Sequence, residues 1–578
     1  MFAGCYLSEE EMQNASHRTV TDVLVDILEA SGIDTCFGVP GGQTLPLYGV
    51  TRARKFRHVM MRDERNCACA ADAYSRVSGR VGVCDATVGP GVTNLVSGLA
   101  EAYASSIPVL ALVADIDTRL EHLRHRSVVA QGFKQRPLME GVSKWVGRVQ
   151  TPDMLVNTMA HALRVATTGR PGPVVVEIPE EIWSAPLTSF DISGFDKSKS
   201  QWPRYRVAAP SSVINDVVAC FRNSKRPIVL AGGGVMASNA YTEITAFADE
   251  FQIPVVTSMN GKGAIDERHP LSLGVVGQFG SVTANHALQQ ADCVLAIGSK
   301  FTTFNSFSWR LPHKEQKVIQ IDMDGEELNR SISTHLDILA DAREASAQIL
   351  NALRALRRTF AWRLDGEVSV QPGTANDDPA VAPEGVVNAI NDVVMENTIM
   401  VSDASLASGW TASRYKSPGN GRKFIAPRGL AGIGWSCGAA VGSAFGAPKG
   451  TRIVLVAGDG SAAYWLGEIE TAVRYQLPIT FVILNNSGFG WVIQYEKKLN
   501  FPHLSTFSPV DYAAVGEATG TKSMRAKTIA EVRSGLRQAA AYDGPFVLDV
   551  LTSQLSDATI SYEAINPDGV SIQSAYSA

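Results

Sequence analysis

The fold is indicated most directly by two apolar runs in the last third of the chain, RIVLVAGDG at residues 452–460 and ITFVILNN at residues 479–486. Each run is short, rich in β-branched residues and closed by Gly, Asp or Asn, which is typical of a strand buried in a parallel sheet. The segment between them, residues 461–478, is long enough for one crossover helix. A right-handed strand–helix–strand unit would therefore bring Asp459 and Asn486 together at the carboxyl edge of one sheet.

The polar residues at this edge have the chemistry of metal ligands. The carboxylate of Asp459, the amide oxygen of Asn486 and a nearby backbone carbonyl are hard oxygen ligands, which suit a Mg²⁺ ion that also binds phosphate oxygens. Gly458 and Gly460 allow backbone N–H groups to approach an anion. We interpret the pair as a metal–diphosphate site. The alternative is an ordinary turn with incidental polar ends, because Gly-Asp-Gly alone is a common turn sequence.

Composition restricts the class of protein. The chain has 578 residues, 45% of them hydrophobic and 19% charged, with a formal net charge of −5, which predicts a soluble globular protein of several domains. Nothing supports nucleic-acid binding, which requires a concentrated basic face. No apolar run is long enough for a membrane span. Residues 1–16 lack the pattern of a secretory signal, so we expect a cytoplasmic protein.

The eight cysteines do not form a recognisable framework. They are scattered through apolar stretches, and Cys67 and Cys69 are spaced neither as a zinc ribbon nor as a thioredoxin motif. We therefore expect buried free thiols in a reducing compartment.

Strand-like and helix-like segments alternate along the chain, which predicts an α/β fold with three Rossmann-like, doubly wound parallel-sheet domains. The first block has helices at 20–31 and 66–78 and a helix opening at Thr93. Gly232, Gly233 and Gly234 follow a strand of the second block, but they do not complete a dinucleotide-binding pattern, so we interpret them as a structural turn. The predicted boundaries are a first domain at 1–188, a linker at 189–210, a central domain at 211–358, a linker at 359–382, a third domain at 383–555 and a tail at 556–578.

Five stretches, in order along the chain, carry a resemblance to a known family. They are residues 37–42 (FGVPGG), residues 62–65 (RDER) with 70–76 (AADAYSR), residues 89–94 (GPGVTN), residues 429–435 (GLAGIGW), and residues 458–460 with 485–486. Together they resemble the thiamine-diphosphate (ThDP) enzymes of the acetolactate synthase-like superfamily, which includes benzaldehyde lyase and benzoylformate decarboxylase. The resemblance covers about residues 17–555 and implies pyrimidine-binding, central and diphosphate-binding domains in that order.

The resemblance implies roles for individual residues. ThDP acts as a carbanion at C2 of its thiazolium ring, and a family glutamate activates the cofactor through N1′ of its aminopyrimidine ring. Glu64 matches that glutamate. Ile433, between Gly432 and Gly434, resembles the apolar wedge that bends the cofactor. The Mg²⁺ ligands would be Asp459, Asn486 and the backbone carbonyl of Gly488. The other diphosphate contacts would be Gly460, Ser461, Ser405 and Ser408.

Other positions bear on the substrate. The aligned segment Lys300–Asn305 lacks the acidic and second basic residues of FAD-binding relatives, so we expect no FAD requirement. Gln131 aligns with a glutamine near the reacting carbon, and Gln135 is an alternative if the loop alignment slips. His122 and His125 are either acid–base groups or exposed loop histidines. The expected substrate-pocket residues are Val39, Val88, Gln131, Trp491 and Gln494.

The resemblance implies a ThDP- and Mg²⁺-dependent carboligase. It would decarboxylate a 2-oxo acid such as pyruvate and transfer the acyl carbanion to a second carbonyl compound. The alternatives are a lyase that cleaves an acyloin, a diketone or a 2-hydroxyacyl compound, a simple 2-oxo acid decarboxylase, and a non-catalytic binding or regulatory relative. The family forms its active sites between subunits, which implies a homodimer or a homotetramer.

Overall fold

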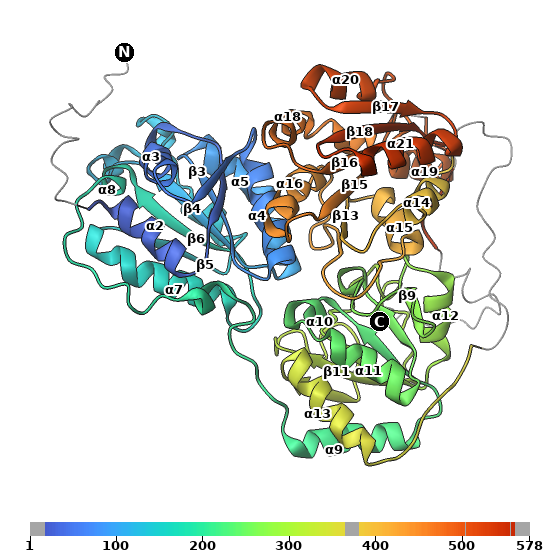
Figure 1. Ribbon diagram of the computed structural model, residues 1–578. Helices are drawn as coiled ribbons and strands as arrows, with labels where there is room; N and C mark the ends of the chain where they lie inside the picture. The colour runs from blue at the N-terminus through green and yellow to red at the C-terminus, as the bar shows by residue number, and fades with distance from the viewer. Residues whose placement is uncertain (1–17, 365–380, 503, 555, 561–578) are drawn as a thin grey trace. The chain divides into compact units, whose positions relative to one another are not determined.

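The computed structural model describes residues 18–364, 381–502, 504–554 and 556–560 (Figure 1). Within these ranges the strands form three six-stranded sheets, all parallel, with helices packed on them. The predicted fold class is confirmed. By its internal contacts the chain divides into two compact units, one formed by residues 18–75 and 80–204 and the other by residues 76–79 and 205–560.

The first unit contains one sheet with strand order β2-β1-β3-β4-β6-β5. Its strands are β1 (Thr35–Gly38), β2 (Arg57–Met60), β3 (Gly82–Ala86), β4 (Val109–Asp115), β5 (Trp145–Arg148) and β6 (Val174–Pro179). Its helices are α2 (Val20–Ala30), α3 (Leu45–Arg52), α4 (Glu64–Ser78), α5 (Pro90–Ser105), α6 (Arg136–Glu140), α7 (Leu155–Thr167) and α8 (Glu180–Trp183). The apolar faces of α2, α3 and α7 bury one side of the sheet.

Two helices of this unit begin earlier than the sequence pattern indicated. Helix α4 begins at Glu64 rather than at Asn66, because the carboxylate of Asp63 accepts a hydrogen bond from the backbone N–H of Arg65 at 2.8 Å. This contact satisfies a free donor in the first turn of the helix. Helix α5 begins at Pro90 rather than at Thr93, since the fixed φ of proline suits the first helical position.

The second unit contains two sheets. The central sheet has the strand order β12-β11-β10-β7-β8-β9. Its strands are β7 (Pro227–Ala231), β8 (Val255–Thr257), β9 (Ser272–Val275), β10 (Cys293–Ile297), β11 (Lys317–Asp322) and β12 (Leu336–Leu339). Its helices are α9 (Ser211–Asn223), α10 (Gly233–Ser238), α11 (Tyr241–Phe251), α12 (Val282–Gln290) and α13 (Ala342–Arg354).

The third sheet has the strand order β14-β13-β15-β16-β18-β17. Its strands are β13 (Thr398–Ser402), β14 (Phe424–Ile425), β15 (Arg452–Gly458), β16 (Ile479–Asn485), β17 (Lys522–Ala526) and β18 (Phe546–Leu551). Its helices are α14 (Pro383–Asn391), α15 (Leu406–Arg414), α16 (Ser436–Gly446), α17 (Asp459–Ala462), α18 (Leu466–Arg474), α19 (Gly490–Lys498), α20 (Tyr512–Thr519) and α21 (Ile529–Ala541).

The strand pair β15 and β16 forms as the sequence predicted, in parallel register from Ile453 opposite Ile479 to Gly458 opposite Leu484. The crossover between them differs in detail, because it contains a short helix α17 followed by α18 rather than one helix. Helix α17 begins at Asp459 itself, so the Gly-Asp-Gly turn is also the first turn of a helix.

Several expected segments are only partly described. Residues 197–204 of the first expected linker pack on the first unit, where Ser200 donates a hydrogen bond to the carbonyl of Ser31 at 2.7 Å. Most of the expected linker at 359–382, most of the tail at 556–578 and the N-terminal segment at 1–16 lie outside the described residues. In the tail, Ile560 donates its N–H to the carbonyl of Gln278 at 2.8 Å.

The seven described cysteines are buried free thiols, as the sequence predicted for them. Among the described residues, no helix has both the length and the apolar character needed to cross a membrane.

A buried ion pair joins the central and third sheets of the second unit. The ammonium of Lys262, which is 1% exposed, contacts both carboxylate oxygens of Glu267, at 2.6 and 2.5 Å. Lys262 also donates to the carbonyl of Ala412 on α15, while Glu267 accepts the backbone N–H of Ser417 at 2.7 Å. Burial lowers the pKa of Lys262, and the charge of Glu267 opposes that shift. Removal of either charge would leave the other one buried without its partner, so the stability of this region depends on both residues.

We predict that Glu267→Gln destabilises the protein by about 3–5 kcal/mol, because it leaves a buried ammonium without its counter-charge. The measurement is the thermal unfolding midpoint, Tm, beside the control Glu315→Gln, whose side chain is exposed. A Tm for Glu267→Gln equal to that of the control would contradict the role of this pair.

Candidate active site

Glu64 lies at the carboxyl edge of the first sheet, as the first residue of α4. The amide of Asn94 on α5 donates to its Oε2 at 3.0 Å. A Cβ added to Gly91 would lie 3.3 Å from its Oε1, so the carboxylate rests against the turn at residues 89–91. The carboxylate of the preceding residue, Asp63, accepts the backbone N–H of Arg65 at 2.8 Å.

Gln131 lies beside the same turn. Gly89 has φ +76°, and a Cβ there would lie 2.6 Å from the carbonyl oxygen of Gln131 and 2.8 Å from its Cβ. The loop after β1 also reaches this edge, because Thr87 donates to the amide oxygen of Gln43 at 2.6 Å. The structure therefore brings Glu64 and Gln131 to the two sides of one glycine turn.

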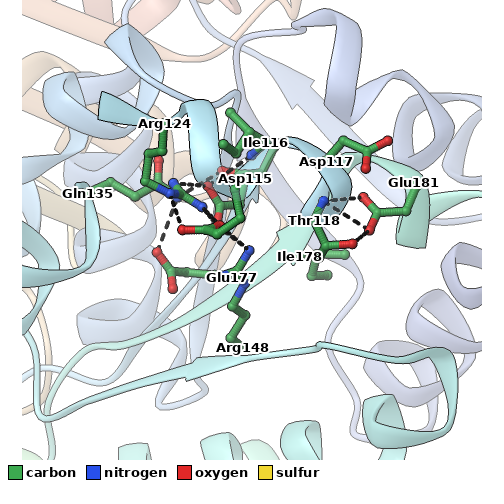
Figure 2. A network of polar contacts seen from close by, with 12 residues as sticks. Asp115, Ile116, Asp117, Thr118, Arg124, Gln135, Arg148, Glu177, Ile178 and Glu181 are labelled. Carbon is green, nitrogen blue, oxygen red and sulfur yellow. Dashed lines mark hydrogen bonds and ion pairs between the residues drawn. The ribbon is translucent and has the colours of Figure 1, made fainter. Parts of the chain in front are cut away.

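A buried polar network holds the segment that carries Gln131 (Figure 2). Arg124 donates to both carboxylate oxygens of Asp115 at the end of β4, at 2.7 and 2.9 Å. Arg148 on β5 lies 3.0 Å from the second of these oxygens. Gln135 donates to the carbonyl of Ala114 at 3.0 Å and to Glu177 at 3.2 Å. Both ends of the loop are therefore anchored to the sheet.

The two candidate glutamines differ in their exposure and in their contacts with this network. The side chain of Gln135 is buried and its amide nitrogen is bound within the network, whereas Gln131 is exposed and has φ +64°. His122 and His125 are also exposed on this loop. Burial and the charge of Asp115 raise the pKa of Glu177.

Two expected pocket residues of the first unit have different surroundings. Val39 directly follows β1 and is half-buried. Val88 is fully buried and packs with Ala114 and Ile116, so its side chain contributes to the interior of the domain.

Asp459 lies at the carboxyl end of β15 and is 1% exposed. Its carboxylate accepts the backbone N–H groups of Gly460 at 3.0 Å and Ser487 at 2.6 Å. Burial raises its pKa to about 6, although these N–H groups act in the opposite direction. Among the described residues, no Lys, Arg or His forms an ion pair with it. A cation bound here would offset the cost of burying this charge.

Asn486 provides a second oxygen at the same edge. Its Oδ1 is buried, and no group in the described part of the chain donates a hydrogen bond to it. This is costly for a polar atom unless a ligand satisfies it. Gly488 follows two residues later, and a Cβ there would lie 2.5 Å from the Cδ1 of Ile493. A carboxylate and an unpaired amide oxygen on adjacent strands are a donor set that fits a Mg²⁺ ion.

The loop that contains Ile433 is fixed by Asp403, a residue that the sequence analysis did not single out. Asp403 is fully buried and accepts the N–H of Gly434 at 3.0 Å and the N–H of Ser436 at 3.2 Å. Gly434 has φ +87°, and a Cβ there would lie 2.7 Å from the Cβ of Tyr464, whereas Gly432 is exposed with open space beside it. Ile433 between them is half-buried. An acidic residue directly after a buried strand was the signal for Asp403.

The serines expected near the diphosphate differ in exposure. Ser405 is half-buried with φ +65°. Ser408 is fully buried, donates to the carbonyl of Ser405 at 2.8 Å and accepts from Arg428 at 3.2 Å. Ser461 and Gly460 are buried in α17.

Trp491 belongs to an aromatic cluster at the junction of the central and third sheets. Its ring lies 5.3 Å from that of Phe279 and 6.0 Å from that of Phe304. The guanidinium of Arg428 lies 5.2 Å from both phenylalanine rings. Gln494, one helical turn after Trp491, is buried and donates to the carbonyl of Ser556 in the tail.

Comparison with known proteins places the chain in a family. Residues 18–138 match the thiamine pyrophosphate enzyme, N-terminal TPP binding domain, residues 214–353 match its central domain, and residues 403–550 match its C-terminal TPP binding domain. TPP, thiamine pyrophosphate, is ThDP. The chain belongs to the thiamine pyrophosphate enzyme family, and it is a ThDP-dependent enzyme.

Its relatives include several proteins of similar length. The chain is 32% identical to the probable acetolactate synthase large subunit of Methanocaldococcus jannaschii, over 92% of this chain and 91% of that protein. It is 29% identical to the acetolactate synthase of Arthrospira platensis, over 95% and 96% of the two chains. It is 30% identical to the acetolactate synthase large subunit of Corynebacterium glutamicum, over 93% and 87%. The predicted resemblance to acetolactate synthase-like enzymes is confirmed.

We predict that Gly89→Ala destabilises the first unit by about 1–3 kcal/mol, because an L-residue is strained at this φ and its Cβ meets the backbone of Gln131. The measurement is Tm by circular dichroism. Gly141→Ala is the control, since Gly141 has φ −73° and its nearest neighbour would lie at 3.6 Å. Equal Tm values for the two variants would contradict the close packing of Gln131 on the turn.

Proposed function

We propose that the protein is a ThDP- and Mg²⁺-dependent carboligase similar to acetolactate synthase. It would join two carbonyl compounds, a donor and an acceptor. The donor is a 2-oxo acid such as pyruvate. The donor loses CO₂, and the carbon of its ketone group forms a bond to the carbonyl carbon of the acceptor. The carbonyl oxygen of the acceptor gains a proton. The family membership and the names of the relatives support this proposal.

The observation that carries the proposal is the pair formed by Asp459 and Asn486. Within the described residues, a buried carboxylate that forms no ion pair lies one strand away from a buried amide oxygen that has no hydrogen-bond donor. This donor set suits a Mg²⁺ ion that links the protein to a diphosphate. In our proposal these two side chains and the carbonyl of Gly488 hold the ion, while Gly460, Ser461, Ser405 and Ser408 surround the phosphates.

ThDP, when bound, supplies a stabilised carbanion at its thiazolium ring. We assign to Glu64 the role of holding a proton at the pyrimidine nitrogen, with its carboxyl group oriented by Asn94. Ile433, with Gly432 and Gly434 beside it, would shape the space between the two ends of the cofactor. Buried Asp403 orients that loop through its N–H groups.

We infer from the family that the active site forms between two subunits. Glu64 of one chain would then act with Asp459 and Asn486 of another, in a homodimer or homotetramer. On the substrate side we place Gln131 and Val39 from the first unit and Trp491 and Gln494 from the second. Val88, whose side chain is fully buried, would support this wall from the interior of the domain. A cytoplasmic location is part of the same proposal.

We further propose that FAD is not required. The segment at residues 300–305 (KFTTFN) lacks a carboxylate, and its Phe304 stacks on Phe279 with the rings 5.6 Å apart. The polar contacts to a bound dinucleotide would therefore have to come from other residues.

The proposal is tested by incubating the purified protein with ThDP, Mg²⁺ and isotopically labelled pyruvate, with a panel of other 2-oxo acids, aldehydes, acyloins and diketones. We expect ThDP-dependent CO₂ release and a coupled product detected by mass spectrometry, with no change when FAD is added. Cleavage of acyloins or diketones without any coupling from 2-oxo acids would contradict the carboligase and favour a lyase.

We predict that Glu64→Gln lowers kcat by about 10²–10⁴-fold, because an amide cannot exchange the proton that the carboxyl group holds. Glu140→Gln, an exposed glutamate in the same unit, is the control. The affinity for ThDP, measured by calorimetry, should change much less than kcat. Unchanged ThDP-dependent turnover in Glu64→Gln would contradict the assigned role.

A further inference from the structure

A second group of ligating side chains lies inside the first unit. Cys36 on β1 pairs directly with His58 on the parallel strand β2, and Gly38 pairs with Asp85 on β3. Because side chains alternate between the faces of a strand, Cys36 and Gly38 share one face. The thiol, the imidazole and the carboxylate offer ligand atoms that all lie within 4.8 Å of one another.

The group is buried beneath helix α3. Cys36 and Asp85 are 0% exposed, and the side chain of His58 is 6% exposed. The ring of Tyr48 on α3 stacks on that of His58 at 3.7 Å, and its hydroxyl donates to Asp85 at 3.3 Å. A Cβ at Gly38 would lie 1.8 Å from Oδ1 of Asp85. Only a glycine leaves room for this carboxylate.

Both ring nitrogens of His58 have polar neighbours. The hydroxyl oxygen of Thr51 lies 3.3 Å from Nδ1. Nε2 lies 2.6 Å from Oδ1 of Asp85, and the thiol of Cys36 donates to the same oxygen at 3.6 Å. The three ligating side chains therefore converge on one point between strands β1, β2 and β3.

We propose that Cys36, His58 and Asp85 form a zinc site, separate from the ThDP site and independent of the proposed carboligase activity. Sulfur, imidazole nitrogen and carboxylate oxygen are the ligand types that Zn²⁺ takes in tetrahedral sites. A water molecule supplies the fourth ligand. The contact between Thr51 and Nδ1 is the outer-shell hydrogen bond that fixes a metal-binding histidine.

The charges and distances fit this ion. Zn²⁺ replaces the thiol proton of Cys36, which is released, and His58 binds the ion as a neutral imidazole with its proton on Nδ1. The thiolate, the carboxylate and Zn²⁺ then form a neutral centre, which is favourable inside an apolar core. Oxygen and nitrogen ligands of a tetrahedral zinc ion are about 3.3 Å apart. The His58–Asp85 contact therefore needs to open by less than about 1 Å.

The site would fasten three adjacent strands just before their functional ends. Val39 directly follows β1, Glu64 comes four residues after β2, and the turn at residues 89–91 follows β3. A zinc ion here therefore acts as a structural clamp beneath the edge that presents Glu64.

The test uses the full-length protein, stripped of metal with a chelator and kept in excess Mg²⁺. Zinc is titrated in competition with a chromophoric chelator, and Co²⁺ is added separately to detect the charge-transfer band of a bound thiolate. We expect one zinc per chain and a thiolate–cobalt band. Cys36→Ala should abolish the band, and Asp85→Asn should weaken zinc binding by at least about 10–100-fold.

Cys84→Ala is the matched control, because Cys84 is also fully buried but lies one residue before Asp85, on the opposite face of β3. It should retain the zinc and the cobalt band. Absence of zinc binding and of a thiolate–cobalt band in the wild-type protein would overturn the proposal and leave a proton-linked His58–Asp85 pair. A band that persists in Cys36→Ala would place the metal elsewhere. The cobalt spectrum of the wild-type protein tests the proposal even if Asp85→Asn does not fold.

Discussion

The carboxyl edge of the third sheet is organised around the buried carboxylate of Asp459. Backbone N–H groups of Gly460 and Ser487 fix its position, and burial raises its pKa to about 6. Asn486 adds a buried oxygen to which none of the residues placed by the structure donates a hydrogen bond. An apolar protein interior tolerates such a combination poorly, because each group has lost water without a full replacement. A cation shared by both oxygens resolves this cost, and the anionic end of a cofactor is what such a cation would attract.

The first sheet uses the same architecture for different chemistry. Glu64, the turn at residues 89–91 and Gln131 all follow the carboxyl ends of strands, where parallel sheets collect their loops. Here side chains fix the positions, whereas backbone N–H groups hold Asp459 in the third sheet. Asn94 holds Glu64, and the network of Asp115, Arg124 and Arg148 anchors the loop of Gln131 to the sheet. The two sheets thus present the carboxyl groups of Glu64 and Asp459 at the carboxyl edges of similar domains.

The sequence predicted the parts that depend on periodicity and local motifs. The strands at 452–458 and 479–485, with Asp459 and Asn486 directly after them, followed from apolar runs ended by turn residues. Helix starts were less accurate, because capping by Asp63 and the first-turn preference of Pro90 act locally against the apolar pattern. Asp403 and the Asp115–Arg124–Arg148 network were not found. An acidic residue directly after a buried strand was the signal for Asp403, but no local spacing reveals which distant residues it contacts. The same holds for the contact of Arg148 with Asp115. The choice between Gln131 and Gln135 likewise required the buried contacts of Gln135.

The central claim is that Asp459 and Asn486 bind ThDP through a magnesium ion. Calorimetric titration of ThDP into the wild-type protein, with saturating Mg²⁺ and again after chelation of all divalent cations, tests it most directly. The account predicts that the affinity for ThDP falls by at least about 10-fold without the metal, while the affinity for unphosphorylated thiamine does not change. Equal affinity for ThDP in the two conditions would contradict it.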